Sequence, residues 1–162
     1  SIDEADLLDR PWRNCRFEGE LPVGLTVDGV REITALRFVL VFGPESLKGP
    51  SLGLTLVTPE ESYAVELTLA DFWDGLKEIA ATLPAGIELH CCFSCQFSDY
   101  SPYGQSTFGS MICVYENREQ WLAGQDKADW IGAHGAEPAW RRETHVCEHV
   151  SPRTRPAGYR GI

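Results

Sequence analysis

The chain has 162 residues, of which 43% are hydrophobic and 10% aromatic, a composition that predicts a folded domain with a sizeable core. Its longest apolar stretch, residues 38–42, is only as long as a strand, so we expect no transmembrane segment. The formal net charge of −10 argues against nucleic-acid binding, because a surface that follows phosphates needs clustered Lys and Arg.

The charge is unevenly distributed. Residues 140–162 contain five Arg and two Glu, a net charge of +3. Because the whole chain carries −10, residues 1–139 carry −13. Two interpretations follow: a basic tail folds back onto an acidic body, or the acidic body faces a basic protein partner. We expect one domain over residues 1–162, with an irregular basic tail from about residue 150 to 162.

Hydrophobic periodicity predicts several strands in the first half of the chain. The Asp28-Gly29 pair is typical of a two-residue hairpin turn, and residues 33–42 have the β-branched and aromatic character of a central strand. The expected strands are residues 13–17, 33–42, 52–56 and 63–69.

The periodicity then becomes helical. Phe72, Leu76 and Ile79 are spaced as on one helix face, which predicts a helix over about residues 70–83 with Thr68 and Asp71 as a weak capping pair. Further expected elements are strands at 87–97, 110–115 and 143–149, a loop at 98–109, and short helices after residue 117, the first capped by Asn117. This order predicts an α+β fold with a mainly antiparallel sheet.

Cysteines are concentrated in the second half of the chain. Cys92 and Cys95 form a C-x-x-C pair, which can hold zinc from a tight turn, and Cys113 and Cys147 could supply the other two ligands. Against this, residues 89–98 alternate as a plain strand would, which places Cys92 and Cys95 on opposite faces as buried core thiols. Spacing alone leaves both interpretations open.

A third arrangement uses histidines. His145, Cys147 and His149 share one face of the expected last strand, and His90 and Cys92 share a face of an earlier strand. If those strands pair, they gather either mixed nitrogen and sulfur ligands or a Cys-His nucleophile pair. A redox role for the C-x-x-C is disfavoured, because no helix pattern follows it.

The loop at residues 98–109 is the best candidate for recognition, because aromatic side chains on a loop bury much area at small entropic cost. Its candidate contact residues are Asp99, Tyr100, Tyr103 and Phe108. The same aromatics could instead close over the metal site. Arg160 is a further candidate, and its simplest role is to order the tail against Asp99 or another carboxylate.

Residues 92–104, which read CFSCQFSDYSPYG, resemble a family of small uncharacterised bacterial proteins with a C-x-x-C, an aromatic residue and then S-D-Y-S-P-Y-G. The resemblance continues in M-x-C at 111–113, E-T-x-x-C at 143–147 and G-Y-R-G at 158–161. It implies that Cys92, Cys95, Cys113 and Cys147 form one zinc-binding set. Cys15 and Cys91 then serve as packing residues. The resemblance implies no activity.

The chain has no G-x-S-x-G, no H-E-x-x-H and no phosphate-binding glycine loop. Four thiolates would leave zinc without an open position, so the metal would be structural. The sequence therefore predicts a small acidic cytoplasmic protein, stabilised by zinc, that binds a protein partner through residues 98–109 in the manner of an immunity protein or adaptor. The alternative is a small thiol- or metal-dependent enzyme that uses Cys92 or Cys147 with a nearby His.

Overall fold

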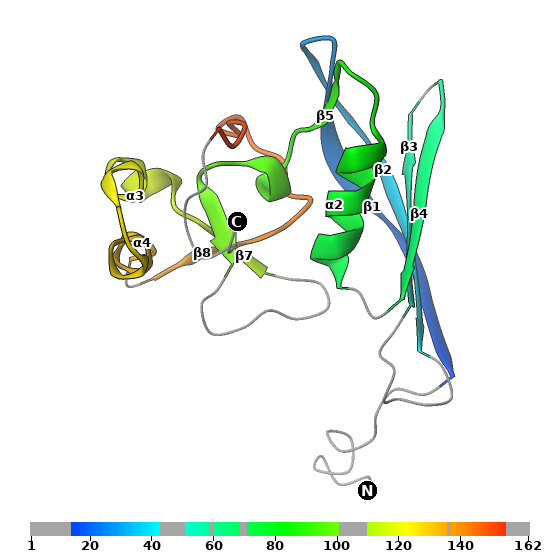
Figure 1. Ribbon diagram of the computed structural model, residues 1–162, viewed down its shortest axis with the longest axis horizontal. Coiled ribbons are helices and arrows are strands. Elements are labelled where there is room, and N and C mark those ends of the chain that lie inside the picture. The colour runs from blue at the N-terminus through cyan, green and yellow to red at the C-terminus, as the bar shows by residue number, and fades with distance from the viewer. Residues whose placement is uncertain are drawn as a thin grey trace, which may run out of the picture.

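The computed structural model describes residues 14–42, 51–58, 60–68, 71–100, 110–135 and 137–154. These residues form an α+β fold with two antiparallel sheets, which confirms the predicted fold class (Figure 1). In chain order the elements are β1 (Cys15–Val27), β2 (Val30–Phe42), β3 (Ser51–Val57), β4 (Ser62–Thr68), α2 (Phe72–Thr82), β5 (Ile87–Leu89), the 3-10 turn η2 (Cys92–Ser94), β6 (Ser98–Tyr100), β7 (Ser110–Cys113), the 3-10 turn η3 (Tyr115–Asn117), α3 (Arg118–Ala123), α4 (Lys127–Ala133) and β8 (Ala139–Arg142).

The large sheet has the strand order β4-β3-β2-β1-β5. β1 and β2 pair along their full length and are joined by the predicted turn, where Asp28 and Gly29 both have positive φ, of 49° and 84°. Positive φ at both central residues gives a turn whose twist matches that of the paired strands. β1 is much longer than the predicted strand at residues 13–17, and it continues to Val27.

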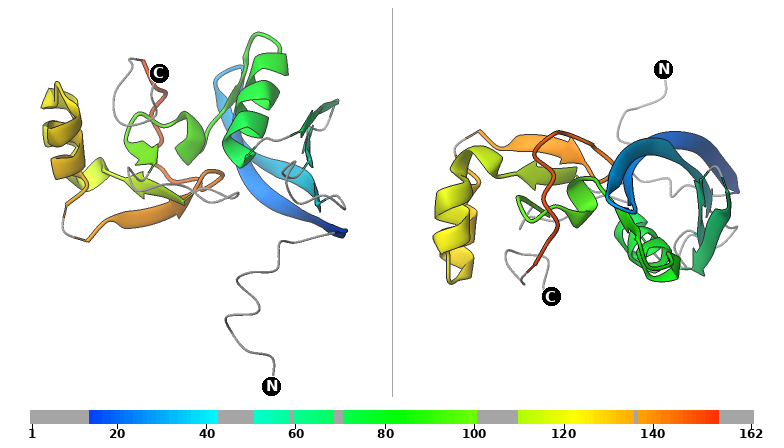
Figure 2. Two further views of the ribbon diagram at one scale, coloured as in Figure 1. Left: turned by 60° about the horizontal axis from the view of Figure 1, so that its bottom comes forward. Right: turned by 90° about the horizontal axis from the view of Figure 1, so that it is seen from above.

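Helix α2 lies in the concave side of the large sheet, which curves round it (Figure 2). Asp71 caps the helix in a reciprocal box with Asp74, rather than with Thr68 as predicted. The helix buries Phe72, Leu76 and Ile79 against the leucines of β2 and β3. This contact forms the main hydrophobic core.

The small sheet has the order β6-β7-β8, and α3 and α4 lie beside it (Figure 1). Trp121 of α3 is fully buried and its Nε1 donates a hydrogen bond to the Gln96 carbonyl at 2.8 Å. Asn117 precedes α3 as predicted but does not cap it. Its Nδ2 donates instead to the Ala133 carbonyl at 3.0 Å, which ties α3 to α4.

Two predicted strands are wrong. The strand expected at residues 87–97 ends at Leu89, and the chain then makes the 3-10 turn η2. The strand expected at residues 143–149 is two turns, closed by His145 N to Arg142 O (3.0 Å) and Val150 N to Cys147 O (3.4 Å). The strand in this region is β8, which pairs with β7.

The two sheets meet through a small set of close contacts. Trp73 of α2 packs against Phe93 and Tyr100, with ring centroids 5.0 and 5.3 Å apart. At the edge of the large sheet, directly after β5, the Gly24 carbonyl accepts a hydrogen bond from His90 N at 2.7 Å. A Cβ atom at Gly24 would overlap the carbonyl oxygen of His90, so the close approach requires glycine.

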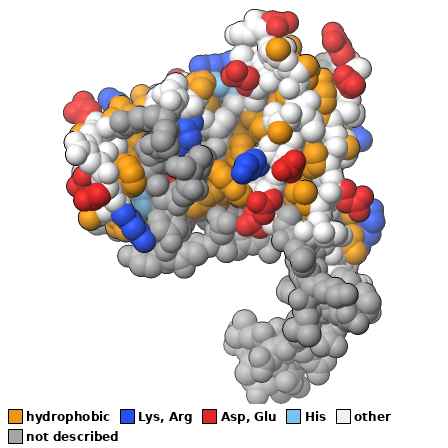
Figure 3. All heavy atoms as spheres, in the orientation of Figure 1, with side chains coloured by type: hydrophobic (Ala, Val, Ile, Leu, Met, Phe, Trp, Pro, Cys, Tyr) orange, Lys and Arg blue, Asp and Glu red, His pale blue; other side chains and the backbone are white. Residues whose placement is uncertain are grey.

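No helix in the described ranges is both long and apolar enough to cross a bilayer. Acidic side chains are spread over the face shown in Figure 3 and do not form one continuous patch. The excess negative charge is therefore distributed over this side of the molecule.

Candidate functional site: the cysteine cluster

The C-x-x-C pair lies on a tight turn. Cys95 N donates to Cys92 O at 3.2 Å, which closes the turn η2. Ser94 makes the strand end here, because its Oγ donates to Leu89 O at 2.6 Å and accepts from Cys91 N at 3.3 Å. These bonds occupy backbone groups that a continuing strand would offer to a neighbour. The strand is therefore interrupted after Leu89 by a turn, as zinc binding by this C-x-x-C pair would require.

Backbone hydrogen bonds hold this turn between two parts of the C-terminal segment. Cys92 N donates to His145 O at 2.8 Å, and Gln96 N donates to Ser151 O at 2.8 Å. Because His145 and Ser151 flank Cys147 in the chain, these two bonds bring the Cys147 region against the C-x-x-C turn.

Cys113 reaches the same place through the small sheet. It ends β7 and is the register partner of Ser98 in β6. Val114 N also donates to Phe97 O at 2.8 Å, which extends this pairing toward Cys95. The fold thus gathers the four cysteines that the family resemblance grouped, although they are far apart in the sequence.

The thiols lie close enough together to shift the pKa values of Cys92 and Cys95. Burial raises the pKa of Cys92, and the neighbouring Cys95, Cys113, Cys91 and Cys147 raise it further. Burial also raises the pKa of Cys95, whereas backbone N–H groups of Ser151 and Phe97 oppose that rise.

The amide contacts at Cys95 are informative about its chemistry. Phe97 N lies 3.4 Å from Cys95 Sγ. Two N–H groups directed at one sulfur stabilise a thiolate over a thiol, and a metal ligand must be a thiolate.

The sulfurs are not arranged as a finished metal site. In the part of the chain that the structure describes, no three His, Cys, Asp or Glu side chains stand so that they could hold a metal ion. Cys92 and Cys95 are buried, and Cys113 and Cys147 are partly exposed. The six cysteines are free thiols. The described residues therefore show four thiols in one region of the fold, without the geometry of a metal site.

The histidines do not form the mixed ligand face that the sequence allowed. That face required a strand at residues 143–149, which is absent. His149 stacks on Tyr115 with ring centroids 3.9 Å apart, and His145 is exposed. His90 is buried and, among the described residues, its Nε2 has no hydrogen-bond partner.

The predicted recognition residues divide into two groups. Tyr103, Phe108 and Arg160 lie outside the described residues. Asp99 and Tyr100 are buried, with 0% and 5% of their surface exposed, so in this structure they pack inside the fold.

Arg153 is a structural residue that the sequence reasoning did not single out. Its guanidinium donates to Ser98 O at 2.8 Å and lies near Asp99. Burial lowers the Arg153 pKa and the Asp99 carboxylate opposes that shift. Arg153 thus holds the strand that follows the C-x-x-C turn. It stands close to Asp99, one of the acids considered for Arg160.

Tyr100 is expected to contribute measurably to stability. Its hydroxyl donates to Glu143 Oε1 at 2.9 Å, and both side chains are buried. Tyr100→Phe leaves the carboxylate without this donor, so we expect the free energy of unfolding to fall by about 1.5 to 3 kcal/mol, measured by urea denaturation.

Tyr63→Phe is the matched control for that experiment. It also removes a Tyr–Glu hydrogen bond, from the Tyr63 hydroxyl to Glu61 Oε2 at 3.3 Å, but at an exposed position. We expect its unfolding curve to overlay that of the native protein. If the two variants lower the free energy of unfolding by the same amount, burial of the Tyr100 hydrogen bond does not matter and the prediction is wrong.

The fold and the cluster define a class: an α+β protein with two antiparallel sheets and a group of convergent thiols beside their junction. The chain belongs to DUF6304, a family of unknown function, which matches residues 5–98. This match confirms membership of an uncharacterised family. It covers the large sheet and the C-x-x-C turn, whereas the motifs that first indicated a resemblance lie mostly after residue 98. No curated protein and no solved structure matches the chain.

Proposed function

We propose that this protein is a non-catalytic binding module whose C-terminal half is stabilised by one zinc ion held by Cys92, Cys95, Cys113 and Cys147. The observation that carries the proposal is the C-x-x-C turn held between segments that flank Cys147, with backbone N–H groups directed at Cys95 Sγ. Four thiolates leave zinc no open position for water.

The net charge of −10 suits a basic protein partner, and acidic side chains are spread over the face shown in Figure 3. The loop predicted at residues 98–109 is wrong at its start, because Ser98–Tyr100 form the buried strand β6. This strand follows the turn directly, so zinc would fix the strand that leads into residues 101–109, the part of the predicted recognition segment that lies outside the described residues. A cytoplasmic setting agrees with this proposal, since thiols stay reduced there.

Metal analysis combined with thiol mapping tests the zinc site. We expect one zinc per chain, and we expect Cys113 and Cys147 to resist iodoacetamide until the metal is removed, although both are partly exposed. Cys15, also partly exposed and outside the set, is the internal control and reacts at once. If the protein is purified without metal and its Cys113 and Cys147 react as fast as Cys15, the proposal is refuted.

A second function has one specific observation in its favour. Cys147 and His90 line the same hollow of about 340 Å³, together with Glu148. A Cys-His nucleophile pair would place Cys147 as the attacking thiol. In that case Cys147 alone would react much faster than Cys15 at neutral pH, and His90→Gln would abolish the difference. Cys92 fits this role less well than Cys147, because it is buried and burial raises its pKa.

A further inference from the structure

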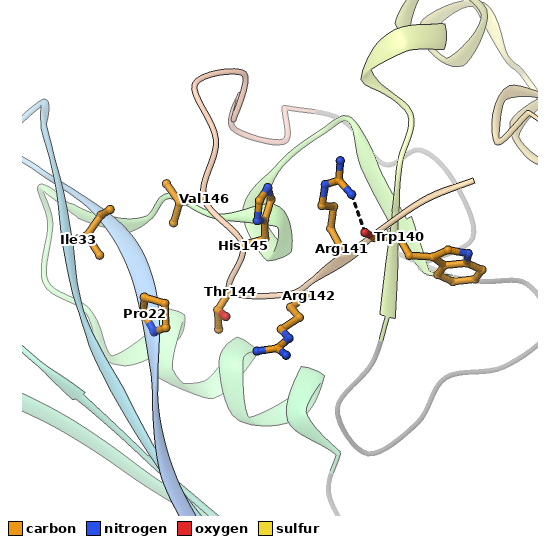
Figure 4. Close-up of a pocket in the computed structure, with 8 residues that line it drawn as sticks. All are labelled: Pro22, Ile33, Trp140, Arg141, Arg142, Thr144, His145 and Val146. Carbon is orange, nitrogen blue, oxygen red and sulfur yellow. Dashed lines mark hydrogen bonds between the residues drawn. The ribbon is translucent and has the colours of Figure 1, made fainter. Parts of the chain in front are cut away.

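A cleft lies between the outer face of the large sheet and the chain around β8. It has a volume of about 650 Å³, within the range of ligand-binding clefts. One wall is Pro22 of β1 and Ile33 of β2, and the other is the segment that continues from β8 into Val146 (Figure 4). The apolar lining is solvent-accessible, since Ile33 is 70% and Trp140 50% exposed.

The cleft is basic, in contrast with the chain as a whole. Arg141, Arg142 and His145 line it, and none of the described acidic residues does. Figure 4 shows Arg142 and Thr144 on one side of the segment and Arg141 and His145 on the other. A second hollow shares Ile33 and Val146 with the cleft and adds a further guanidinium, that of Arg31. Glu32 and Glu148 line only this second hollow.

Two of these guanidinium groups are available to a ligand. Among the described residues, neither Arg31 nor Arg142 makes a side-chain hydrogen bond or an ion pair. Arg141 is bonded only to the carbonyl of its neighbour Trp140, at 2.8 Å. Unpaired arginines beside exposed apolar side chains fit a ligand that carries carboxylates and apolar groups together.

The backbone beside the cleft favours a peptide over a small molecule. β8 is the last strand of the small sheet, so within the described residues its outer edge has no partner strand. An exposed strand edge offers main-chain groups to an extended peptide. In β8 the Trp140 carbonyl already accepts from Arg141 and the Arg142 carbonyl from His145 N, so the peptide would have to share or replace these bonds. Side chains of that peptide would alternate between the apolar wall and the arginines.

We propose that this cleft binds an extended acidic segment of a partner protein, which adds as a strand to the edge of β8 and pairs its carboxylates with Arg142 and Arg31. This goes beyond the proposed zinc-stabilised module and does not depend on metal occupancy. The acidic body of the protein repels such a segment elsewhere, so the basic cleft also directs where it binds.

Fluorescence anisotropy with a labelled ten-residue peptide, in which Glu alternates with Leu or Phe, tests the proposal on the full-length protein. We expect saturable binding that Arg142→Gln weakens about tenfold and that Arg31→Gln weakens by a similar factor, as loss of a charge-assisted hydrogen bond predicts. Both residues are exposed, so thermal unfolding of the variants should match that of the native protein.

Arg16→Gln is the matched control, because it makes the same change of charge at the far end of β1, in an exposed pair with Glu18 at 3.1 Å. It should leave the affinity unchanged. The peptide with Lys in place of Glu should not bind, and methylating alternate backbone nitrogens of the acidic peptide should abolish binding.

Three results would overturn the proposal. The first is no saturable binding of the acidic peptide, and the second is an equal loss in Arg16→Gln and Arg142→Gln. The third is tight binding of citrate alone with no effect of peptide methylation, which would make the cleft a site for small carboxylates. Each can be told apart from failure of the zinc site, because metal content is measured on the same samples.

Discussion

Replacing Cys92 by Ala is expected to abolish zinc binding and to unfold the C-terminal half of the protein. A structural zinc site contributes about 10 kcal/mol of apparent folding free energy, which is comparable with the total stability of a domain. A chelator should therefore have the same effect on the native protein. Metal content and the thermal unfolding midpoint are the two measurements, and both should fall together.

Cys91→Ala is the control, because it makes the same substitution at the adjacent residue. Cys91 is fully buried in the core of the large sheet, beside Leu25 and Leu89, and not in the proposed ligand set. We expect it to retain one zinc per chain and to lose only about 1 kcal/mol, from the small cavity that it leaves. If Cys91→Ala and Cys92→Ala behave alike and neither protein holds metal, the four cysteines are core thiols.

Gly24→Ala is expected to destabilise the protein by about 3 kcal/mol, at the upper end of the usual cost of overpacking. The new Cβ would overlap the backbone carbonyl of His90 and lie 3.0 Å from Val146 Cγ2. Neither neighbour can yield easily, because His90 N is itself bonded to Gly24 O and Val146 packs against the core. Denaturant unfolding measures the loss.

Gly53→Ala is the comparison for that variant. Gly53 is also a strand residue, in β3, but the nearest atoms to its added Cβ are 3.8 Å away, an ordinary contact. We expect no loss of stability there, and a small gain is consistent with the lower backbone freedom of Ala in the unfolded chain. If the Gly24→Ala protein is as stable as the Gly53→Ala protein, this prediction is wrong. It would mean that β1 and the segment after β5 can move apart without lowering the free energy of unfolding.

The sequence predicted β2, β3, β4 and α2 well because their signals are local, whereas it missed most of β1 and placed the end of β5 too late. Alternating apolar residues, the Asp28-Gly29 turn and the helical spacing of Phe72, Leu76 and Ile79 each act within a few residues. All three appear in the structure at nearly the expected positions. Local patterns of this kind are reinforced by the fold as a whole.

The region around the cysteines was harder to predict, for two physical reasons. Residues 89–98 alternate like a strand, and the hydroxyl of Ser94 overrides that pattern through hydrogen bonds to the backbone. Serine is a known turn residue, so this signal was present but weak. The strand expected at 143–149 failed because its backbone bonds go to the turn η2 instead, as in Cys92 N to His145 O.

The proposed zinc set was grouped by motif alone, and in the fold its members come near one another through long-range contacts. The hydrogen bonds from Cys92 N to His145 O and from Gln96 N to Ser151 O bring the Cys147 region near Cys95. Each bond joins residues more than fifty positions apart, so no local sequence pattern could reveal it. The same holds for Arg153, whose role depends on carbonyls of Cys95 and Ser98.

The turn η2 is bonded on one side to residues 143–145 and on the other to residues 151–153. During synthesis, the ribosome therefore releases the C-x-x-C turn long before it releases the backbone groups that hold it. The β1–β4 meander and α2 contain their own partners and can fold while translation continues. In a nascent chain that has not yet reached residue 153, the amides of the turn η2 lack some of their carbonyl partners. The thiols of Cys92 and Cys95 are then exposed, and chaperones would meet the chain in this form.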